Sequence, residues 1–411
     1  MAAPPNRIER DALGEVEIAA DALYGAQTAR AVAALSFSGR RLCDYPRYVA
    51  ALTVVKQAAA RANRDAGVLD ETRARAVEDA CVAARSERHR GQFPVDVLAG
   101  GGSIAINVNV NEVIANLANQ IVGGTLGVYE PIHPKAHVNA SQSTADVCHT
   151  AVRLAVLDSA ADLLRGLSDC GEAVRAKAEA LRPITTMSRT CLQDGFPVSL
   201  GELFGGWATA LARRTVELDR AIQALRQVGL GGTVIGSGDG APAAYRAVVI
   251  DHLSEIAGTR LVRRANLYDA AQNIDDLAAV SAQLALLADA LSKIAQDLRL
   301  LASGPIGGFG EVTLPAVQEG SSFFAGKINP AVPETVMQCG FQVLACDRAV
   351  QLAYGRGELY LNVFEGVAAV NLLDAVTMLT RAVPLLAGCV SGLTANEKRC
   401  RELAAQARVV P

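Results

Sequence analysis

The sequence predicts an all-α protein whose core is a long helical bundle. Hydrophobic residues make up 51% of the 411 residues but aromatic residues only 4%, so the apolar mass is largely Ala, Leu and Val. This composition favours helices, because strands depend more on aromatic and β-branched side chains. Residues 144–181 and 199–227 contain few helix breakers, and residues 277–301 repeat apolar side chains every three or four positions. Such patterns are typical of helical bundles.

The first part of the chain is expected to form shorter helices joined by loops. Apolar residues recurring at three- and four-residue steps predict helices at residues 46–68, 70–88 and 104–122. A flexible turn is expected at residues 100–103, which read Gly-Gly-Gly-Ser. Residues 128–134 are expected to form a loop, because they contain two closely spaced prolines.

Longer helices are expected from about residue 144. Loops around 182–183 and 187–197 separate the helices at 144–181 and 199–227, and a Gly-rich loop covers residues 228–241. Two further helices are predicted at 331–354 and 361–391. The expected domains are a mostly helical N-terminal domain at 1–143, a central long-helix domain at 144–395 and a short tail at 396–411.

Residues 277–301 carry the clearest helical pattern. Its apolar residues are Leu277, Val280, Leu284, Leu287, Leu291, Ile294, Leu298 and Leu301. This spacing requires a partner helix packed at a shallow angle. The opposite face carries small residues, namely Ala278, Ala282, Ala285 and Ala288. Small residues on that face predict a helix surrounded on several sides at the centre of an oligomeric bundle, and the alternative is a core helix of a monomer.

Composition also excludes several classes of protein. The net charge is −3 and no Lys/Arg run is long enough to grip phosphates, so nucleic acid is not an expected partner. No metal is expected, because the five histidines lack ligand spacing. No cofactor is expected either, because the Gly-rich loop lacks the strand and the Gly/Lys spacing of a nucleotide loop.

The cellular location is predicted from three further features. The nine cysteines are scattered without a CxxC pair, as in a reduced intracellular protein. The N-terminus lacks a basic and then apolar leader. Apolar stretches such as Leu284–Leu291 are interrupted by Asp and Lys, so no membrane span is expected. We therefore expect a soluble, cytoplasmic protein.

Five segments in order along the chain carry a family resemblance. They are Ala22–Thr28 (ALYGAQT), Asn109–Asn116 (NVNEVIAN), His137–Thr144 (HVNASQST), Ser188–Asp194 (SRTCLQD) and Gly320–Pro330 (GSSFFAGKINP). Together they resemble the aspartase/fumarase superfamily, in its aspartate ammonia-lyase and class II fumarase branch. The resemblance implies a lyase that releases fumarate from a small dicarboxylate. It also implies a homotetramer in which three subunits build each active site.

The resemblance assigns roles to residues of these segments. Ser321 matches the catalytic base, which must remove a weakly acidic Cβ proton beside a carboxylate. Substrate-binding roles fall on residues that would hold the two carboxylates: Ser143, Thr144 and Ser322 for one, and Thr190, Lys327 and Asn329 for the other. Backbone amides near Gly320 and Gly326 are expected to make the base stronger.

Three positions depart from the family pattern. Ile104, Ala145 and Cys191 stand where relatives carry polar residues that contact the leaving group. Ile and Ala offer no acceptor to an ammonium ion, and a thiol is a weak one. These residues predict a leaving group other than ammonia, with nitrosuccinate yielding fumarate and nitrite as the favoured reaction. The alternatives are an ordinary aspartate ammonia-lyase or fumarase, and a non-catalytic paralogue.

The C-terminal end also differs from the family pattern. Relatives continue beyond the segment Thr394–Glu397 into a small helical domain, which is expected to be absent here or reduced to the tail at 396–411. Ala325 replaces the family's proline in the signature loop, which is expected to loosen that loop slightly.

Overall fold

The computed structural model describes residues 6–408, which divide into two compact units. Of the described residues, unit 1 comprises 6–158, 222–278 and 349–373. Unit 2 comprises 159–221, 279–348 and 374–408. Each unit therefore combines three stretches of chain, whereas the division expected from the sequence used continuous ranges. That earlier division remains a prediction.

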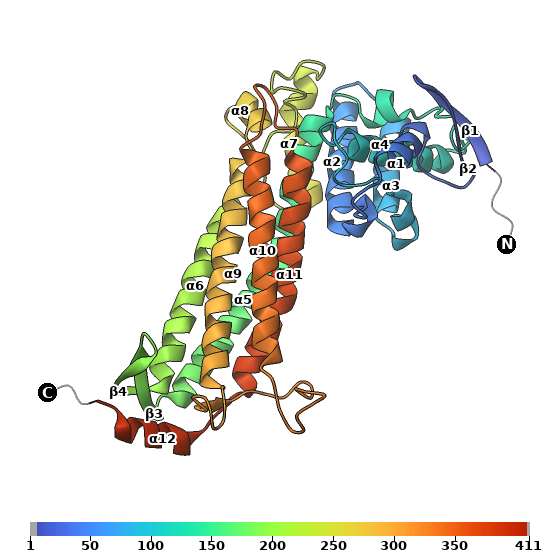
Figure 1. Ribbon diagram of the computed structural model, residues 1–411. Coiled ribbons are helices and arrows are strands. Elements are labelled where there is room, and N and C mark those ends of the chain that lie inside the picture. Colours follow the sequence, from blue (N-terminus) through green and yellow to red (C-terminus); the bar gives the residue numbers. More distant parts are fainter. Residues whose placement is uncertain (1–5, 409–411) are drawn as a thin grey trace. The chain divides into compact units, whose positions relative to one another are not determined.

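Unit 1 is a cluster of short and medium helices (Figure 1). Its helices are α1 (Ala26–Leu35), α2 (Pro46–Asp65), α3 (Glu71–Ala84), α4 (Ile104–Ile121), α7 (Ala243–Ala257), α8 (Leu267–Gln272) and the start of α5 (Thr144–Leu181), with short turns η1 (Leu42–Asp44), η2 (Glu87–Gln92) and η3 (Pro134–Val138). Two small sheets complete it: the antiparallel pair β1 (Asn6–Asp11) and β2 (Gly14–Ala19), and the parallel pair β5 (Gln227–Val228) and β6 (Val262–Arg263). Helix α2 packs against α3 and α7, and α3 packs against α4. The η3 turn is a π-helical turn that leads directly to α5.

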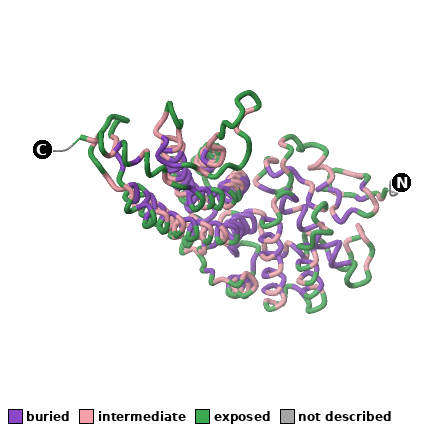
Figure 2. The backbone as a smooth tube through the Cα atoms, turned by 90° about the horizontal axis from the view of Figure 1, so that it is seen from below, coloured by how far each residue is buried: buried purple, intermediate pink, exposed green. Residues whose placement is uncertain are grey.

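Unit 2 is a bundle of long helices that lie side by side in Figures 1 and 2. It contains most of α5 and α6 (Leu200–Ala224), with large parts of α9 (Asp275–Leu301), α10 (Ala331–Tyr354) and α11 (Glu365–Gly392). Short elements close one end of the bundle: the hairpin β3 (Thr185–Thr190) and β4 (Gln193–Ser199), the pair β7 (Val312–Thr313) and β8 (Thr394–Ala395), and α12 (Glu397–Gln406). The loop between α9 and α10 lies at this same end. This mostly helical architecture confirms the predicted fold class.

Helix α9 has the buried seam that its sequence predicts. All eight seam residues from Leu277 to Leu301 are at most 7% exposed. Of the opposite alanines, Ala278, Ala285 and Ala288 are also buried within a single chain. The helix is therefore surrounded on several sides within one chain, and its place at the centre of an oligomeric bundle stays a prediction.

In the part of the chain that the structure describes, two helices are long and apolar enough to cross a membrane by length and composition alone. They are α9, with a mean hydropathy of 1.4 over its best window, and α11, with 1.5. Length and composition alone do not decide the matter, and the expectation of no membrane span stays a prediction. However, 56% and 50% of the two windows are buried inside the protein, and a buried core helix passes the same test.

Several elements were not anticipated from the sequence. The segment 187–197, expected to be a loop, belongs to the β3–β4 hairpin. Helices α7 and α8 follow the Gly-rich loop, and α12 occupies most of the segment expected to be a short tail. The remaining long helices begin and end within a few residues of their predicted limits, apart from the start of α11.

Candidate active site

The start of α5 presents two hydroxyl groups whose protein partners leave them free to donate. Ser143 precedes the helix and Thr144 is its first residue. The amide of Ala145 donates to Ser143 Oγ at 3.3 Å, and Asn107 Nδ2 donates to Thr144 Oγ1 at 2.9 Å. A hydroxyl that accepts a hydrogen bond keeps its own hydrogen for another partner. Both side chains can therefore donate to an anion, at a helix N-terminus that also favours negative charge.

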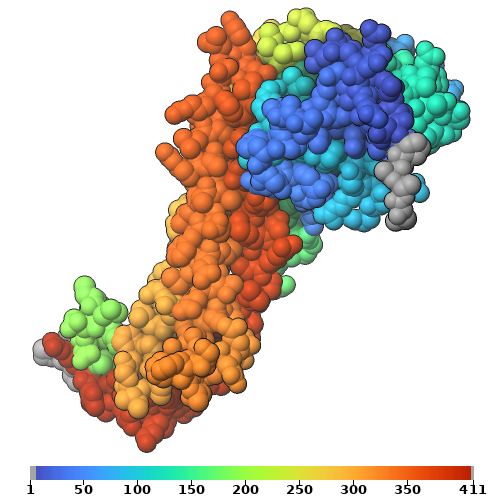
Figure 3. Space-filling model, turned by 45° about the vertical axis from the view of Figure 1, so that its right-hand side comes forward, coloured from blue at the N-terminus to red at the C-terminus, as the bar shows by residue number. Residues whose placement is uncertain are grey.

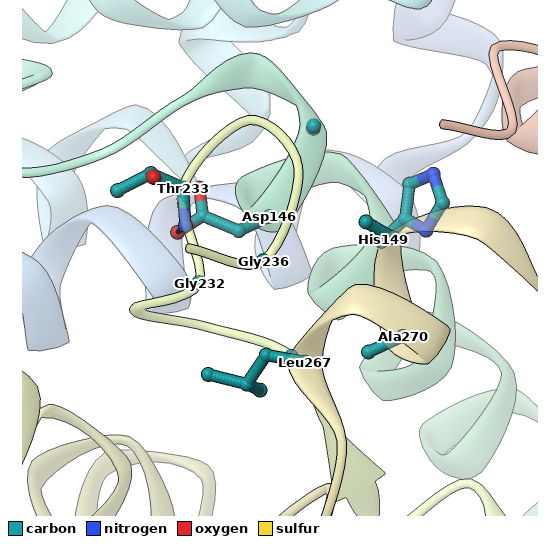
Figure 4. Close-up of a pocket in the computed structure, with 10 residues that line it drawn as sticks. Asp146, His149, Gly232, Thr233, Gly236, Leu267 and Ala270 are labelled. Carbon is teal, nitrogen blue, oxygen red and sulfur yellow. Dashed lines mark hydrogen bonds between the residues drawn. The ribbon is translucent and has the colours of Figure 1, made fainter. Parts of the chain in front are cut away.

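Asp146 connects this helix start to the Gly-rich loop. Its Oδ1 accepts from the Ser143 amide at 2.9 Å, and its Oδ2 accepts from the amides of Gly231 and Thr233 at 3.0 Å each. Figure 4 shows the Asp146 side chain lying against the loop at Thr233. Burial raises the pKa of Asp146 to about 6, against the opposing effect of these three amide donors. No role for this loop was predicted from the sequence. Its amides nevertheless hold Asp146, which in turn accepts from the Ser143 amide.

A cavity of about 10 Å³, roughly large enough for one water molecule, lies beside Ala145. Asp146 and His149 line it together with residues of the Gly-rich loop and α8 (Figure 4). The Nε2 atom of His149 lies 3.0 Å from the backbone oxygen of Asn362, and burial lowers the pKa of the ring. A neutral ring that donates through Nε2 has its acceptor at Nδ1. The cavity lining thus includes groups able to accept hydrogen bonds.

Ile104 is the first residue of α4, the helix that also supplies Asn107 to Thr144. Its side chain is 54% exposed, whereas Ala145 is buried. Unit 1 holds the predicted residues Ser143, Thr144, Ile104 and Ala145. The remaining predicted site residues belong to unit 2.

Thr190 and Cys191 lie at the turn of the β3–β4 hairpin. Thr190 pairs with Gln193, and Cys191 and Leu192 both have positive φ angles of 53° and 60°. Positive φ at both central residues is the geometry of a type I′ hairpin turn. The Cys191 side chain is exposed. Thr190 and Cys191 therefore lie at the surface of the chain.

Glu311 anchors this hairpin from inside unit 2. Its side chain is fully buried, it accepts from Arg189 Nη1 at 2.6 Å, and it also accepts from Thr186 Oγ1. Because Arg189 precedes Thr190 directly, this contact fixes the strand that carries the predicted carboxylate ligand. The sequence gave no sign of this partner, since it lies more than one hundred positions further along the chain.

The loop between α9 and α10 carries the predicted base. Ser321 Oγ accepts hydrogen bonds from the amides of Phe323 at 3.0 Å and Phe324 at 2.8 Å. Donors aimed at an oxygen favour its negatively charged form. The amides that do this are therefore those of Phe323 and Phe324, rather than those of Gly320 or Gly326. Figure 3 shows this segment, in orange, at the surface of unit 2.

Backbone and side-chain contacts hold the ends of this loop together. Gly320 N donates to Lys327 O at 2.7 Å, and Asn329 Nδ2 donates to Gly320 O at 2.6 Å. A Cβ atom at Gly320 would lie 2.3 Å from Lys327 O, so only glycine fits there. Asn329 thus uses its amide within the loop, while Ser322 and Lys327 are exposed.

Within residues 6–408, no group of three or more His, Cys, Asp or Glu side chains could hold a metal ion.

Comparison with known proteins identifies the family. Residues 14–345 match the family model described as lyase. An aspartate ammonia-lyase from Pseudomonas canavaninivorans is 42% identical over 399 residues, which cover 97% of this chain and 84% of that protein. The chain belongs to the lyase family of the aspartase/fumarase superfamily. It is a carbon–nitrogen lyase, as the five sequence segments predict.

Two solved structures share the fold of this lyase. A fumarate lyase:delta crystallin from Brucella melitensis, bound to cobalt, has a TM-score of 0.94 and 43% identity, covering 97% of this chain and 87% of that chain. A class II fumarase from Schistosoma mansoni has a TM-score of 0.94 and 26% identity, with the same coverage of 97% and 87%. These likenesses confirm the predicted fold class and superfamily.

The prediction of a leaving group other than ammonia is wrong. Relatives from Pseudomonas, Helicobacter, Bacillus and Escherichia, 38% to 42% identical over nearly the whole chain, are all named aspartate ammonia-lyase. Ile104, Ala145 and Cys191 alone therefore do not determine the leaving group. The nitrosuccinate reaction is therefore abandoned in favour of the ordinary alternative.

Proposed function

We propose that this lyase converts L-aspartate to fumarate and ammonia. The observation that carries the proposal is the similarity, over 97% of the chain, to a protein named aspartate ammonia-lyase. The geometry at the start of α5 supports it, because a carboxylate accepts hydrogen bonds and Ser143 and Thr144 can both donate them. The substrate is therefore a small dicarboxylate.

The reaction needs a base, protein groups that bind the two substrate carboxylates, and an amine that departs. The base takes a proton from the Cβ atom, the electrons of that C–H bond form the double bond, and the Cα–N bond breaks with its electron pair on nitrogen. Charge that develops on the neighbouring carboxylate is stabilised by donors already in position. In this proposal Ser143, Thr144 and Ser322 hold that carboxylate.

Ser321 acts as the base, with the other carboxylate held by Thr190, Lys327 and Asn329. Two amides already donate to Ser321 Oγ, which lowers the free energy of forming an alkoxide there. For Asn329 to reach a substrate, its bond to Gly320 O must open or be shared. Movement of this loop on substrate binding therefore belongs to the proposal.

We also propose a cytoplasmic homotetramer whose active sites are shared by three subunits. The helices of unit 2 expose large apolar side chains, which a second copy of the chain would cover. These are Leu203 and Val216 of α6, Leu286 of α9, Phe341 and Leu344 of α10, and Leu385 of α11. A Leu286→Asp variant should sediment as smaller species than the wild type at equal concentration. An unchanged assembly would count against this face as the interface.

The activity is tested by following fumarate absorbance with L-aspartate and, separately, with L-malate. L-Aspartate should yield fumarate and ammonia in equal amounts, and a Ser321→Ala variant should lose this activity. If the protein produced fumarate from L-malate and not from L-aspartate, it would instead be a fumarase. The Schistosoma mansoni relative is named as an enzyme of that kind. A chain that acts on neither substrate would contradict the proposal.

A further inference from the structure

Lys56 is a buried cation that the proposed reaction does not use. It lies on α2 with 0% of its surface exposed, and its Nζ atom donates to Asn139 Oδ1 at 2.7 Å. Among the described residues, no carboxylate pairs with it within ion-pair distance. An isolated ammonium is costly to bury. Burial accordingly lowers the pKa of Lys56 to about 7, although Cys148 and Asp146 on α5 and Cys81 on α3 oppose the shift.

Asn139 receives more than this one hydrogen bond. Its Oδ1 atom also accepts from Asn107 Nδ2 at 3.1 Å and from Asn111 Nδ2 at 3.2 Å. Its Nδ2 atom donates to Gln142 O at 3.1 Å, in the turn that leads to α5. Asn139 therefore lies at the centre of a polar network between α2, α4 and the start of α5.

Two groups fix the orientation of the Asn139 amide: the Lys56 ammonium, which only donates, and the Gln142 carbonyl, which only accepts. A lysine ammonium only donates, so the atom of Asn139 that faces it must be the oxygen. The atom of Asn107 that faces this oxygen must then be the nitrogen, which has two hydrogens. The second hydrogen goes to Thr144 Oγ1. Thr144 must accept here, and its own hydrogen is left for a substrate.

The neighbouring amide groups agree with this order. The buried Oδ1 atoms of Asn107 and Asn111 have no hydrogen-bond partner in the described structure. Both side chains thus direct their nitrogens toward Asn139, although this leaves their oxygens unpaired. Only the ammonium form of Lys56 is restricted to donating, because a neutral amine carries N–H donors and also a lone pair that can accept.

We propose that Lys56 is a positioning residue that, through Asn139 and Asn107, holds the Thr144 hydroxyl as a donor toward a substrate carboxylate. The inference rests on the proposed binding of a dicarboxylate at the start of α5. Without a donor-only group at position 56, only the bond from Asn139 Nδ2 to Gln142 O holds the amide of Asn139 against turning over. If it turns over, the amide of Asn107 can turn as well. The Thr144 hydroxyl can then donate its hydrogen to a group inside the protein instead of to a substrate.

Succinate binding tests the inference without requiring turnover. Calorimetry on the full chain should show succinate affinity reduced about tenfold or more in Lys56→Met, as expected for a lost donor to a charged group. Asn107→Asp has nearly the same shape but offers Thr144 an acceptor, so it should weaken binding at least as much. Lys56→Arg, another donor-only residue, should retain more affinity than Lys56→Met if it folds. For L-aspartate, KM should rise more than kcat falls.

Asn63 provides the matched control. It lies on the same helix, is fully buried, donates to Ala140 O at 2.9 Å and accepts from Ser141 Oγ at 2.6 Å, but it has no bond to this network. Asn63→Leu should lower the melting temperature and leave succinate affinity within about twofold. Equal affinity of Asn107→Asp and wild type would overturn the inference, as would an equal loss in Asn63→Leu. A wild type that binds succinate without deaminating L-aspartate would refute only the proposed function, whereas one that does not bind succinate would refute both.

Discussion

Removing the Thr144 hydroxyl tests the carboxylate-binding role of the α5 start. Thr144→Val keeps the shape of the side chain but removes the hydrogen that we assign to a substrate carboxylate. It also removes the acceptor of Asn107 Nδ2, 2.9 Å away. A hydrogen bond to a charged group contributes about 1.5–3 kcal/mol, so KM for L-aspartate should rise roughly 10- to 150-fold.

The same helix offers a control for this substitution. Thr150 is fully buried, and its Oγ1 atom has no hydrogen-bond partner in the described structure. Thr150→Val should therefore leave KM unchanged and keep or slightly raise the stability of the protein. Steady-state kinetics on both variants, with succinate as a competitive inhibitor, separates binding from turnover. If KM for Thr144→Val stayed within about twofold of wild type, the donor role of this hydroxyl would be refuted.

Three other predictions concern the base, a buried ion pair and a buried acid. Ser321→Ala should lower kcat by about 10²–10⁴-fold with little change in succinate affinity, and retention of wild-type kcat would exclude Ser321 as the base. Asp276→Ala should lower the free energy of unfolding by about 3–5 kcal/mol, because it leaves Arg153 buried without the two 2.7 Å hydrogen bonds that it makes to Asp276. Urea unfolding at fixed protein concentration measures this loss, and a loss below about 1 kcal/mol would contradict the prediction. The pKa of Asp146 is raised from 3.8 to about 6, so its contribution to stability is greatest below pH 3.8 and is lost as the pH rises through about 6. Relative to Asp146→Asn, the wild type should lose roughly 3 kcal/mol over that range, and a constant difference between the two proteins would show that the buried acid does not titrate in this way.

The long helices could be predicted because their sequence patterns are local. The seam of α9 repeats over many turns, and each of its residues is buried as its spacing implies. The β3–β4 hairpin was missed because Gly195 and Pro197 interrupt its second strand, and because Cys191 and Leu192 are not typical type I′ turn residues. Helices α8 and α12 are short, so they give only a weak periodic signal.

The site was less predictable than the fold because its supporting contacts join distant parts of the chain. Family motifs indicated Ser143, Thr144 and Ser321, whose roles remain predictions. No motif indicated that Lys56 bonds to Asn139, more than eighty positions away. The leaving-group prediction failed for the same reason. It considered three side chains at aligned positions and could not include contacts with distant segments, such as those of Asp146 with Gly231 and Thr233.

The most direct test of the account is a coupled measurement of both products from L-aspartate. With the purified full chain, fumarate is followed by its ultraviolet absorbance while released ammonia is measured in the same sample. We expect the two products in a one-to-one ratio, with fumarate formed at least about 100-fold more slowly by Ser321→Ala. Absence of fumarate from L-aspartate, in a wild-type protein that is folded and binds succinate, would contradict the proposed deamination.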